Sequence, residues 1–325
     1  MRGEDPCTDT GHTADVGQFA RELGKGLSGT PKKISSKYLY DATGSWLFEQ
    51  ICGLEEYYLT RLETTILKRN IAHIAGLCGP QCLLVELGCG NIRKSRLLLD
   101  ALEDPVGYVP IDISAEPLMR TAADLEGQYP GLEVVPLCAD FTLSWSLPPL
   151  RHPPRRKVFF FPGSTIGNFE EGDAVQLLAG LARNCRPGDG MLIGADLVKE
   201  KQILERAYDD PKGVTAAFNL NLLNRANREL GARFRTEHFR HRALFNQNWK
   251  RVEMHLVSQM EQEVEIGAQR FRFAEMESVI TEYSYKYTVE DFRRLLRASG
   301  WNPAGVWTDP GEWFSVHYST WGGGE

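Results

Sequence analysis

The stretch LLVELGCGNIRKSRLLLDAL, residues 83–102, decides the fold. It begins as an apolar run with the length of a buried strand, breaks at two glycines, and resumes with helical spacing. Gly88 and Gly90 carry no Cβ, so the backbone there can pass close to a ligand. The GxxxxGK[ST] motif of a P-loop is absent, and Arg93 stands at the third glycine position of GxGxxG. The stretch predicts a strand, a tight turn and a helix, but it does not identify a ligand.

Four further apolar runs follow, and they alternate with segments of helical periodicity. The runs are residues 107–113, 132–141, 157–165 and 190–198. Strands that alternate with helices predict an α/β fold, a Rossmann-like core with a mostly parallel sheet and helices on both faces. After residue 199 the pattern changes to a helical segment followed by alternating polar and apolar residues, which indicates antiparallel strands.

These changes of pattern predict two domains and a short leading segment. Residues 1–16 are polar, lack the apolar core of a signal peptide, and are expected to be a flexible lead-in. Residues 61–199 and 286–325 are expected to form the α/β core. Residues 17–60 and 200–285 are expected to form a second, α+β domain that binds the substrate.

The composition narrows the class of protein. The chain has 325 residues, of which 42% are hydrophobic and 25% charged, as in ordinary globular proteins. A net charge of -6 argues against nucleic acid as a partner, and no stretch approaches the roughly 20 apolar residues of a membrane span. The seven cysteines lack CxxC spacing, which fits a reducing cytoplasm. His238 and His241 have no third ligand nearby in sequence, so a solvated basic face is preferred over a metal site.

Acidic residues close the next two predicted strands. Asp112 lies 22 residues after Gly90, where an acid accepts hydrogen bonds from ribose hydroxyls. Asp140 and Phe141 close the third strand, where an acid and an aromatic ring can flank an adenine. The alternative is a tight turn followed by two capping aspartates. Three matched elements at three successive strand ends instead favour an S-adenosylmethionine-dependent methyltransferase.

Longer motifs carry a closer resemblance. They are YLYDATGSWLFEQICGLEEYYLTRLE, LVELGCGNIRKSRLLLDAL, FFPGSTIGNF, AYDDPKGVTAAFNLNLL and ITEYSYKY. From about residue 30 to its end, the chain resembles the histidine Nα-methyltransferases of ergothioneine biosynthesis. That family methylates the α-amino group of L-histidine three times to give hercynine. The resemblance implies a class I methyltransferase core, S-adenosyl-L-methionine as methyl donor, no metal, and a cytoplasmic, monomeric enzyme acting on a small molecule.

The motif ITEYSYKYT contains the residues that are expected to bind the substrate ring. Its period of two places Glu282, Ser284 and Lys286 on one face of a strand. A carboxylate and a hydroxyl on one face can hold the two nitrogens of an imidazole. The motif alone favours an ordinary exposed strand, but the resemblance assigns imidazole binding to Glu282 and Ser284.

The resemblance assigns the other substrate contacts as well. Tyr57, Asn168 and Tyr208 are expected to bind the amino acid moiety, and Met254 to pack in the pocket. Tyr40 is expected beside the amino group, so that Tyr40 and Asn168 are the candidate catalytic residues. Taken singly, Asn168 is equally well a turn residue, and Tyr57, Tyr208 and Met254 are ordinary packing residues.

The expected cofactor residues, also by resemblance, are Gly88, Lys94, Asp112, Asp140 and Phe141. Lys94 stands in the first turn of a predicted helix, where the helix dipole does not favour a cation. The methionine carboxylate of the cofactor would explain it, whereas the alternative is a solvated surface lysine.

Two other functions stay open from the sequence. Relatives of the family methylate tryptophan or tyrosine, but such a pocket should lack the pair formed by Glu282 and Ser284. A non-catalytic module that binds S-adenosylmethionine would not need the substrate residues at all.

Overall fold

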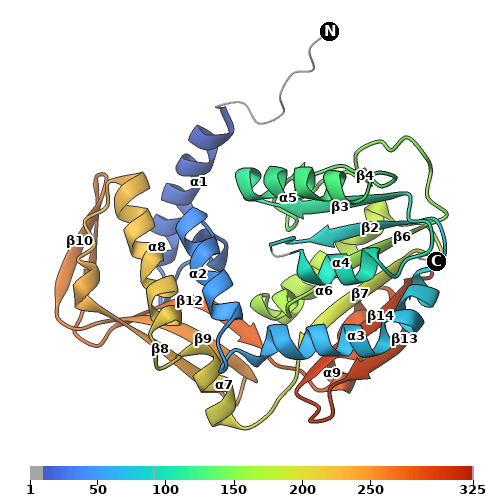
Figure 1. The fold of residues 1–325 in the computed structure, drawn as a ribbon. Helices are drawn as coiled ribbons and strands as arrows, with labels where there is room; N and C mark the ends of the chain where they lie inside the picture. Colours follow the sequence, from blue (N-terminus) through green and yellow to red (C-terminus); the bar gives the residue numbers. More distant parts are fainter. Residues whose placement is uncertain (1–9, 91, 324–325) are drawn as a thin grey trace. The chain divides into compact units, whose positions relative to one another are not determined.

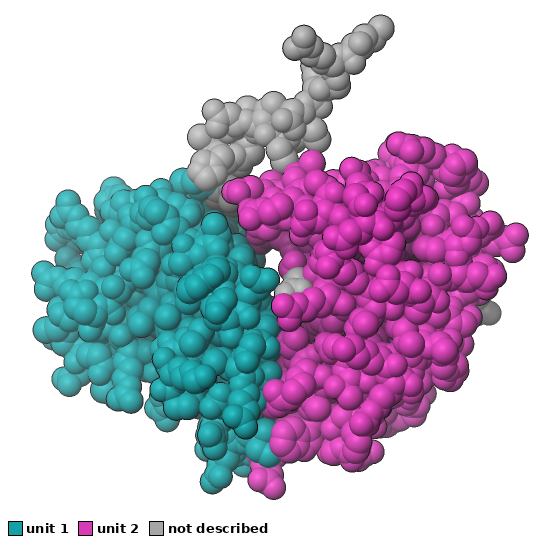
Figure 2. All heavy atoms as spheres, viewed as in Figure 1, with its two compact units in different colours: residues 1–57, 201–283 teal, residues 58–200, 284–325 magenta. Residues whose placement is uncertain are grey.

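A computed structural model of the chain describes residues 10–90 and 92–323, and the chain divides into two compact units (Figures 1 and 2). Unit 1 contains the described chain up to Tyr57 together with Lys201–Tyr283. Unit 2 contains Tyr58–Glu200 and the described chain from Ser284 onward. Of the expected lead-in, residues 1–9 lie outside the described residues, and helix α1 (Thr10–Leu27) occupies the remainder.

Unit 2 is built on an eight-stranded sheet with the order β13-β14-β7-β6-β2-β3-β4, in which β5 also pairs with β3 (Figure 1). Its strands are β2 (Cys82–Leu87), β3 (Gly107–Asp112), β4 (Glu133–Val134), β5 (Leu137–Cys138), β6 (Arg156–Phe161), β7 (Gly190–Asp196), β13 (Trp301–Thr308) and β14 (Phe314–Trp321). The pairs from β4 to β7 are parallel, and β14 and β13 close the sheet in antiparallel pairing. The chain leaves β2 for β3 on one side and returns to β6 on the other. The strand order therefore reverses at β2, the position at which such sheets bind ligands.

Helices cover both faces of this sheet. They are α3 (Tyr58–Cys78), α4 (Arg93–Leu99), α5 (Ala115–Gln128), α6 (Glu171–Gly180) and α9 (Val289–Ala298), with the short helices η2 (Thr165–Asn168) and η3 (Leu181–Asn184). Val85, Phe159 and Ile193 belong to the core that α6 and α9 complete. Gly194 points to the opposite face, against α3. The predicted α/β class, with a mostly parallel sheet and helices on both faces, is confirmed.

Two details of the sheet differ from the prediction. The third predicted strand, residues 132–141, is divided into β4 and β5 with Pro136 between them. Proline has no N–H to donate to a neighbouring strand, so the ladder stops there. Strand β13 was not predicted, because Pro303 and Gly305 are residue types that are rare inside strands. Its register shifts between these two residues.

Unit 1 contains a four-stranded sheet, β1-β12-β9-β8, and a separate hairpin, β10-β11. Its strands are β1 (Lys32–Lys33), β8 (Phe239–Asn246), β9 (Arg251–Ser258), β10 (Gln262–Ile266), β11 (Gln269–Phe273) and β12 (Ser278–Tyr285). Besides α1, its helices are η1 (Ser36–Leu39), α2 (Ala42–Cys52), α7 (Lys201–Tyr208), α8 (Val214–Leu230) and η4 (Thr236–His238). Helices α7 and α8 pack on β8 and β9, and α2 packs on α8. The antiparallel strands predicted after residue 233 are confirmed.

The described helices include none with the length and apolar character needed to cross a membrane.

Candidate active site

The glycine turn after β2 lies where the strand order of unit 2 reverses. Gly88 has φ +71° and Gly90 φ +28°, and residues with a Cβ rarely adopt such values. The amides of Gly88 and Cys89 donate to the carbonyl of Ile111, at 2.8 and 3.3 Å, which holds the turn against the end of β3. A Cβ on Gly88 would lie 3.7 Å from the Phe141 ring, an ordinary contact. Glycine is therefore required here by backbone conformation, and Gly88 lies beside the expected adenine neighbour.

Glu86, near the end of β2, forms hydrogen bonds that stabilise this turn. Its buried carboxylate accepts hydrogen bonds from Ser95 Oγ, at 2.5 Å, and from the hydroxyl of Tyr108. These bonds join the end of β2 to the first turn of α4 and to β3. Burial raises the pKa of Glu86 to about 7, although both hydroxyls and Lys94 act to lower it. Glu86 therefore positions the turn and stays away from solvent.

Asp112 ends β3, and Asp140 lies two residues after β5, which runs beside β3 with Cys138 paired to Asp112. Asp112 Oδ1 accepts from the amide of Ser114 at 2.9 Å, and Asp140 Oδ1 accepts from the amide of Thr142 at 2.9 Å. The capping role that competed with cofactor binding thus exists, and it uses Oδ1 of each acid. Both acids are only partly buried, at an edge of the sheet that the glycine turn shares.

Lys94 has a charge partner that the sequence did not suggest. Its Nζ lies 2.6 Å from Oε2 of Glu63, whose side chain is fully buried on α3. Both carboxylate oxygens of Glu63 also accept from the amide of Gly163, at 3.0 and 2.9 Å. A Cβ on Gly194 would lie 2.2 Å from Glu63 Oε1, so this glycine makes room for the carboxylate. Lys94 is therefore not the solvated surface lysine of the alternative, because Glu63 holds it beside the turn at Gly163.

The turn that carries Asn168 packs on the end of β12. Ser164 begins it with φ +60°, a left-handed conformation, and η2 follows. A Cβ on Gly167 would lie 2.8 Å from the carbonyl oxygen of Tyr285, so only glycine permits this approach. Asn168 and Ser284, the two expected substrate residues of unit 2, thereby lie on adjoining segments.

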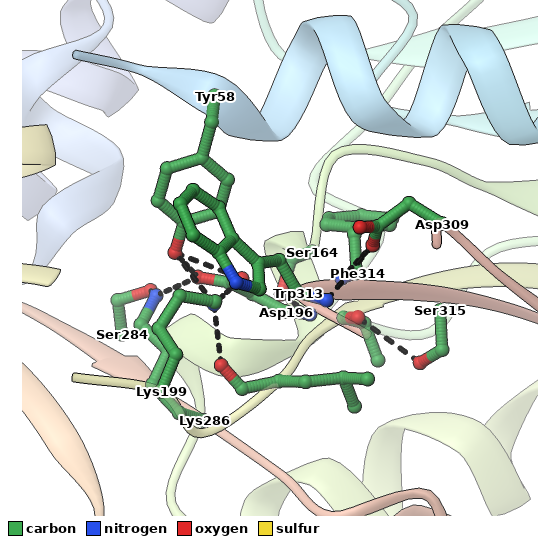
Figure 3. A network of polar contacts seen from close by, with 12 residues as sticks. Tyr58, Ser164, Asp196, Lys199, Ser284, Lys286, Asp309, Trp313, Phe314 and Ser315 are labelled. Carbon is green, nitrogen blue, oxygen red and sulfur yellow. Dashed lines mark hydrogen bonds and ion pairs between the residues drawn. The ribbon is translucent and has the colours of Figure 1, made fainter. Parts of the chain in front are cut away.

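A buried polar network lies behind Ser284 (Figure 3). Asp196, at the end of β7, is fully buried and forms ion pairs with Lys199 at 2.6 Å and Lys286 at 2.8 Å. The Tyr58 hydroxyl donates to Asp196, at 3.0 and 2.9 Å from its two oxygens. Burial raises the pKa of Asp196, but the charges of Lys286 and Lys199 outweigh this effect and hold the pKa below its usual value. Asp196 is thus ionised at neutral pH, and Lys286 also donates to Ser284 Oγ at 2.7 Å.

Unit 1 gathers three of the expected site residues in one aromatic cluster. Ring centroids are 5.5 Å apart for Tyr40 and Phe48, 5.4 Å for Tyr40 and Phe218, 6.1 Å for Phe48 and Tyr57, and 6.0 Å for Tyr57 and Tyr208. All four contacts are edge-to-face, an arrangement that aromatic quadrupoles favour. The structure thus brings Tyr40, Tyr57 and Tyr208 together from three separate parts of the chain.

Glu282 faces the same cluster. Burial raises the pKa of the Tyr57 hydroxyl, and nearby Tyr208, Cys52, Tyr40 and Glu282 raise it further. These groups therefore converge on one hydroxyl, which stays protonated at neutral pH. Met254 is buried on β9, next to β12, and its carbonyl accepts from Thr281 Oγ1 at 3.1 Å.

His241 is a residue of this region that sequence reasoning missed. It is buried, its Nε2 donates to the carbonyl of Tyr208 at 2.8 Å, and its Nδ1 accepts from Asn219 Nδ2 at 2.9 Å. Burial lowers the pKa of His241 despite the nearby Tyr208 carbonyl and Asp209. The expectation of a solvated face is wrong for His241. The alternation in FRHRALF, which places it on the same side as Phe239 and Phe245, was the available signal.

Within the part of the chain that the structure describes, no group of three or more His, Cys, Asp or Glu residues is arranged to hold a metal ion.

Comparison with known proteins identifies the family. The family model for histidine-specific, S-adenosylmethionine-dependent methyltransferases matches residues 19–321. The chain is 42% identical over 308 residues to the histidine N-alpha-methyltransferase of Mycobacterium tuberculosis (strain CDC 1551 / Oshkosh), covering 93% of each chain. It is 41% identical to the protein of the same name from Mycolicibacterium smegmatis, covering 89% of this chain and 91% of that one.

A fungal relative is longer than this chain. The chain is 30% identical to ergothioneine biosynthesis protein 1 of Neurospora crassa, covering 86% of this chain but 32% of that protein.

The family and the class I methyltransferase core expected from the sequence are confirmed. This chain belongs to the histidine-specific, S-adenosylmethionine-dependent methyltransferases.

Proposed function

We propose that the protein transfers methyl groups from S-adenosylmethionine to the α-amino group of L-histidine three times, giving hercynine in the first step of ergothioneine biosynthesis. The observation that carries this proposal is the family match over residues 19–321. The arrangement of unit 2 supports it, because the glycine turn and two acids meet where the strand order reverses.

The residues at this edge of unit 2 fit the cofactor. Asp112 would accept hydrogen bonds from the ribose, and Asp140 and Phe141 would flank the adenine. Lys94 would bind the methionine carboxylate, with Glu63 holding the ammonium in place. The positive φ of Gly88 brings the backbone close without a Cβ. When bound, S-adenosylmethionine supplies a methyl group on a sulfonium centre.

The substrate residues would orient histidine and keep its amine reactive. Tyr57, Asn168 and Tyr208 would hold the amino acid moiety, with Met254 packing against it. The raised pKa of Tyr57 keeps its hydroxyl a donor at neutral pH, which suits a carboxylate partner. Glu282 and Ser284, two residues apart on β12, would bind the imidazole ring.

Tyr40 and Asn168 are the proposed catalytic residues beside the amine. Both are neutral, so they can orient the nitrogen lone pair and still tolerate the positive charge that develops on it. One proton leaves the amine before each transfer.

The remaining parts of the proposal are that unit 1 chiefly binds substrate, unit 2 binds cofactor, and no metal takes part. We further propose a monomer in the cytoplasm, with no nucleic acid or membrane partner.

Mass spectrometry of reactions with each of the twenty amino acids and S-adenosylmethionine tests the function. Three successive methyl additions to histidine, all on the α-nitrogen, are expected. Fragmentation that places a methyl group on the imidazole would overturn the proposal. Preferred methylation of tryptophan or tyrosine would replace histidine as the substrate. Binding of S-adenosylhomocysteine without turnover of any amino acid would leave a non-catalytic module.

A further inference from the structure

We infer that Lys286 is a positioning residue for the substrate ring: it orients the Ser284 hydroxyl as a donor, so that histidine binds with a neutral imidazole whose unprotonated nitrogen faces Ser284. The inference deepens the proposed function and rests on it, because it concerns how Ser284 recognises the imidazole ring of histidine.

The contact between Lys286 and Ser284 has only one possible direction. The Lys286 side chain is fully buried, and its Nζ lies 2.7 Å from Ser284 Oγ (Figure 3). An ammonium group has three donors and no lone pair, so Ser284 Oγ is the acceptor. The hydroxyl hydrogen then points away from Lys286. Lys286 thus uses one lone pair of Ser284 Oγ, which favours the hydroxyl as a donor toward a substrate ring and an unprotonated ring nitrogen facing it.

The surrounding network keeps Lys286 in this position. Asp196 lies 2.8 Å from its Nζ and is itself held by Tyr58 and Lys199. The backbone is fixed as well, because the amide of Tyr287 donates to the carbonyl of Asp196 at 3.0 Å. Swinging the ammonium away from Ser284 would break an ion pair between two fully buried side chains. Such a break is costly in a low-dielectric interior.

The charges around Lys286 also disfavour a protonated ring. Lys286 and Lys199 face one carboxylate, Asp196, while Asp309 acts on Lys199 from further away and the Tyr58 hydroxyl is neutral. Burial lowers the pKa of Lys199 to about 8, so Lys199 is charged near pH 6. Lys286 is the charged group in contact with Ser284 Oγ, and a cation in this position disfavours an imidazolium at the same hydroxyl. Glu282, two residues earlier on β12, is the group expected to accept the remaining N–H of a neutral ring.

Proton release on binding tests this inference directly. The probe is hercynine, whose quaternary amine has no titrating proton, added to the protein with S-adenosylhomocysteine. Calorimetry at pH 6 in two buffers of different ionisation enthalpy gives the number of protons released. A free imidazole with a pKa near 6.5 is about 75% protonated at pH 6. The wild type should therefore release about 0.75 proton per hercynine bound, falling toward zero at pH 8.

Matched variants distinguish two roles of Lys286, namely orientation of the Ser284 hydroxyl and general stabilisation of the buried network. Lys286→Met should release less than half as many protons at pH 6 as the wild type. Lys286→Arg, which keeps a cationic donor, should restore release. Lys199→Met also removes a cation from Asp196 but does not touch Ser284, so it should release as many protons as the wild type.

Each outcome has a defined meaning. Equal proton release by Lys286→Met and the wild type overturns the inference, even if affinity falls, because a purely structural role changes affinity alone. If Lys286→Met fails to bind S-adenosylhomocysteine, the wild type alone still tests the inference. Absence of proton release by the wild type at pH 6 then overturns it. A wild type that binds S-adenosylhomocysteine but neither histidine nor hercynine instead refutes the proposed function.

Discussion

The two units carry their expected ligand residues in different ways. In unit 2, Gly88, Asp112 and Asp140 each follow a strand of one parallel sheet, so the fold itself brings them to a common edge. In unit 1, Tyr40 and Tyr208 come from distant segments and meet only through side-chain packing. The first arrangement depends on backbone geometry and local turns. The second depends on how several helices and strands pack together.

This difference predicts that variants will separate into two groups. Changes at the strand ends of unit 2 should alter cofactor affinity, whereas changes in the cluster of unit 1 should alter the response to the amino acid. Four substitutions, taken from the largest expected effect to the smallest, can break or sharpen that division.

Glu63→Ala should have the largest effect, because it removes a fully buried carboxylate from Lys94 and from the Gly163 amide. Breaking such a pair costs about 3 to 5 kcal/mol of unfolding free energy, since a charge is left without compensation. Urea denaturation should show this loss together with weaker S-adenosylhomocysteine binding. Glu261→Ala, at an exposed ion pair with Arg272 in unit 1, is the control. A stable Glu63→Ala protein with normal cofactor affinity would contradict the role given to Glu63.

Asp112→Ala should weaken S-adenosylhomocysteine binding with little change in stability. Loss of charged hydrogen bonds to the ribose should cost about 1.5 to 3 kcal/mol, or roughly 10- to 150-fold in affinity. The fold should survive because Asp112 is only partly buried. Calorimetry measures the affinity, with Asp100→Ala, at the exposed C-terminal end of α4, as the control. Unchanged affinity in a folded variant would remove Asp112 from the cofactor site.

Glu282→Ala should reduce kcat/KM for histidine while leaving cofactor affinity nearly intact. The lost bond to an imidazole N–H is worth about 1.5 to 3 kcal/mol, and sites built around such bonds reject analogues that lack the polar group. Activity on tryptophan should rise relative to histidine. A competition assay with both amino acids and limiting cofactor gives the product ratio. If that ratio matches the wild type, Glu282 does not bind the imidazole ring. The residues around Tyr40 and Tyr57 are then the next candidates for ring binding.

His317 should make unit 2 less stable in mild acid. It is fully buried on β14, and burial lowers its pKa to about 3. The folded pKa lies below the unfolded value of about 6.5, so the unfolded chain binds the proton first and stability is lost as pH falls below 6.5. The loss from this residue should reach about 1.4 kcal/mol at pH 5.5.

Unfolding free energies between pH 7.5 and 5.5 measure this effect. His317→Gln should lose less stability over that interval than the wild type. His152→Gln, at an exposed position of the same unit, should behave as the wild type does. Parallel pH dependence in all three proteins would show that His317 is protonated without unfolding.

The sequence predicted the parts of the molecule that depend on local patterns. The strands at residues 82–87, 107–112, 156–161 and 190–196 are visible as apolar runs, and the acid that follows the second of them is visible by position. The burial of β12 was less apparent, because its alternation alone suggested an exposed strand, whereas all but its end residues are buried.

Features that depend on packing were not predictable. The ion pair of Lys94 joins residues 31 positions apart on different helices, and no short pattern indicates it. The two prolines, Pro136 and Pro303, altered the strand assignments at both sides of the sheet. The site residues of unit 1 could be assigned only through a family resemblance, since an aromatic residue in a helix is ordinarily a packing residue.

The same two prolines bear on how the sheet of unit 2 ends. An exposed strand edge presents unpaired N–H and C=O groups, and it can serve as a template for aggregation with another chain. At one side, Pro136 divides the edge into β4 and β5, each two residues long. At the other side, Pro303 lies in β13 where the register shifts. Neither edge offers an uninterrupted row of donors, so the sheet is protected at both sides against growth by strand addition.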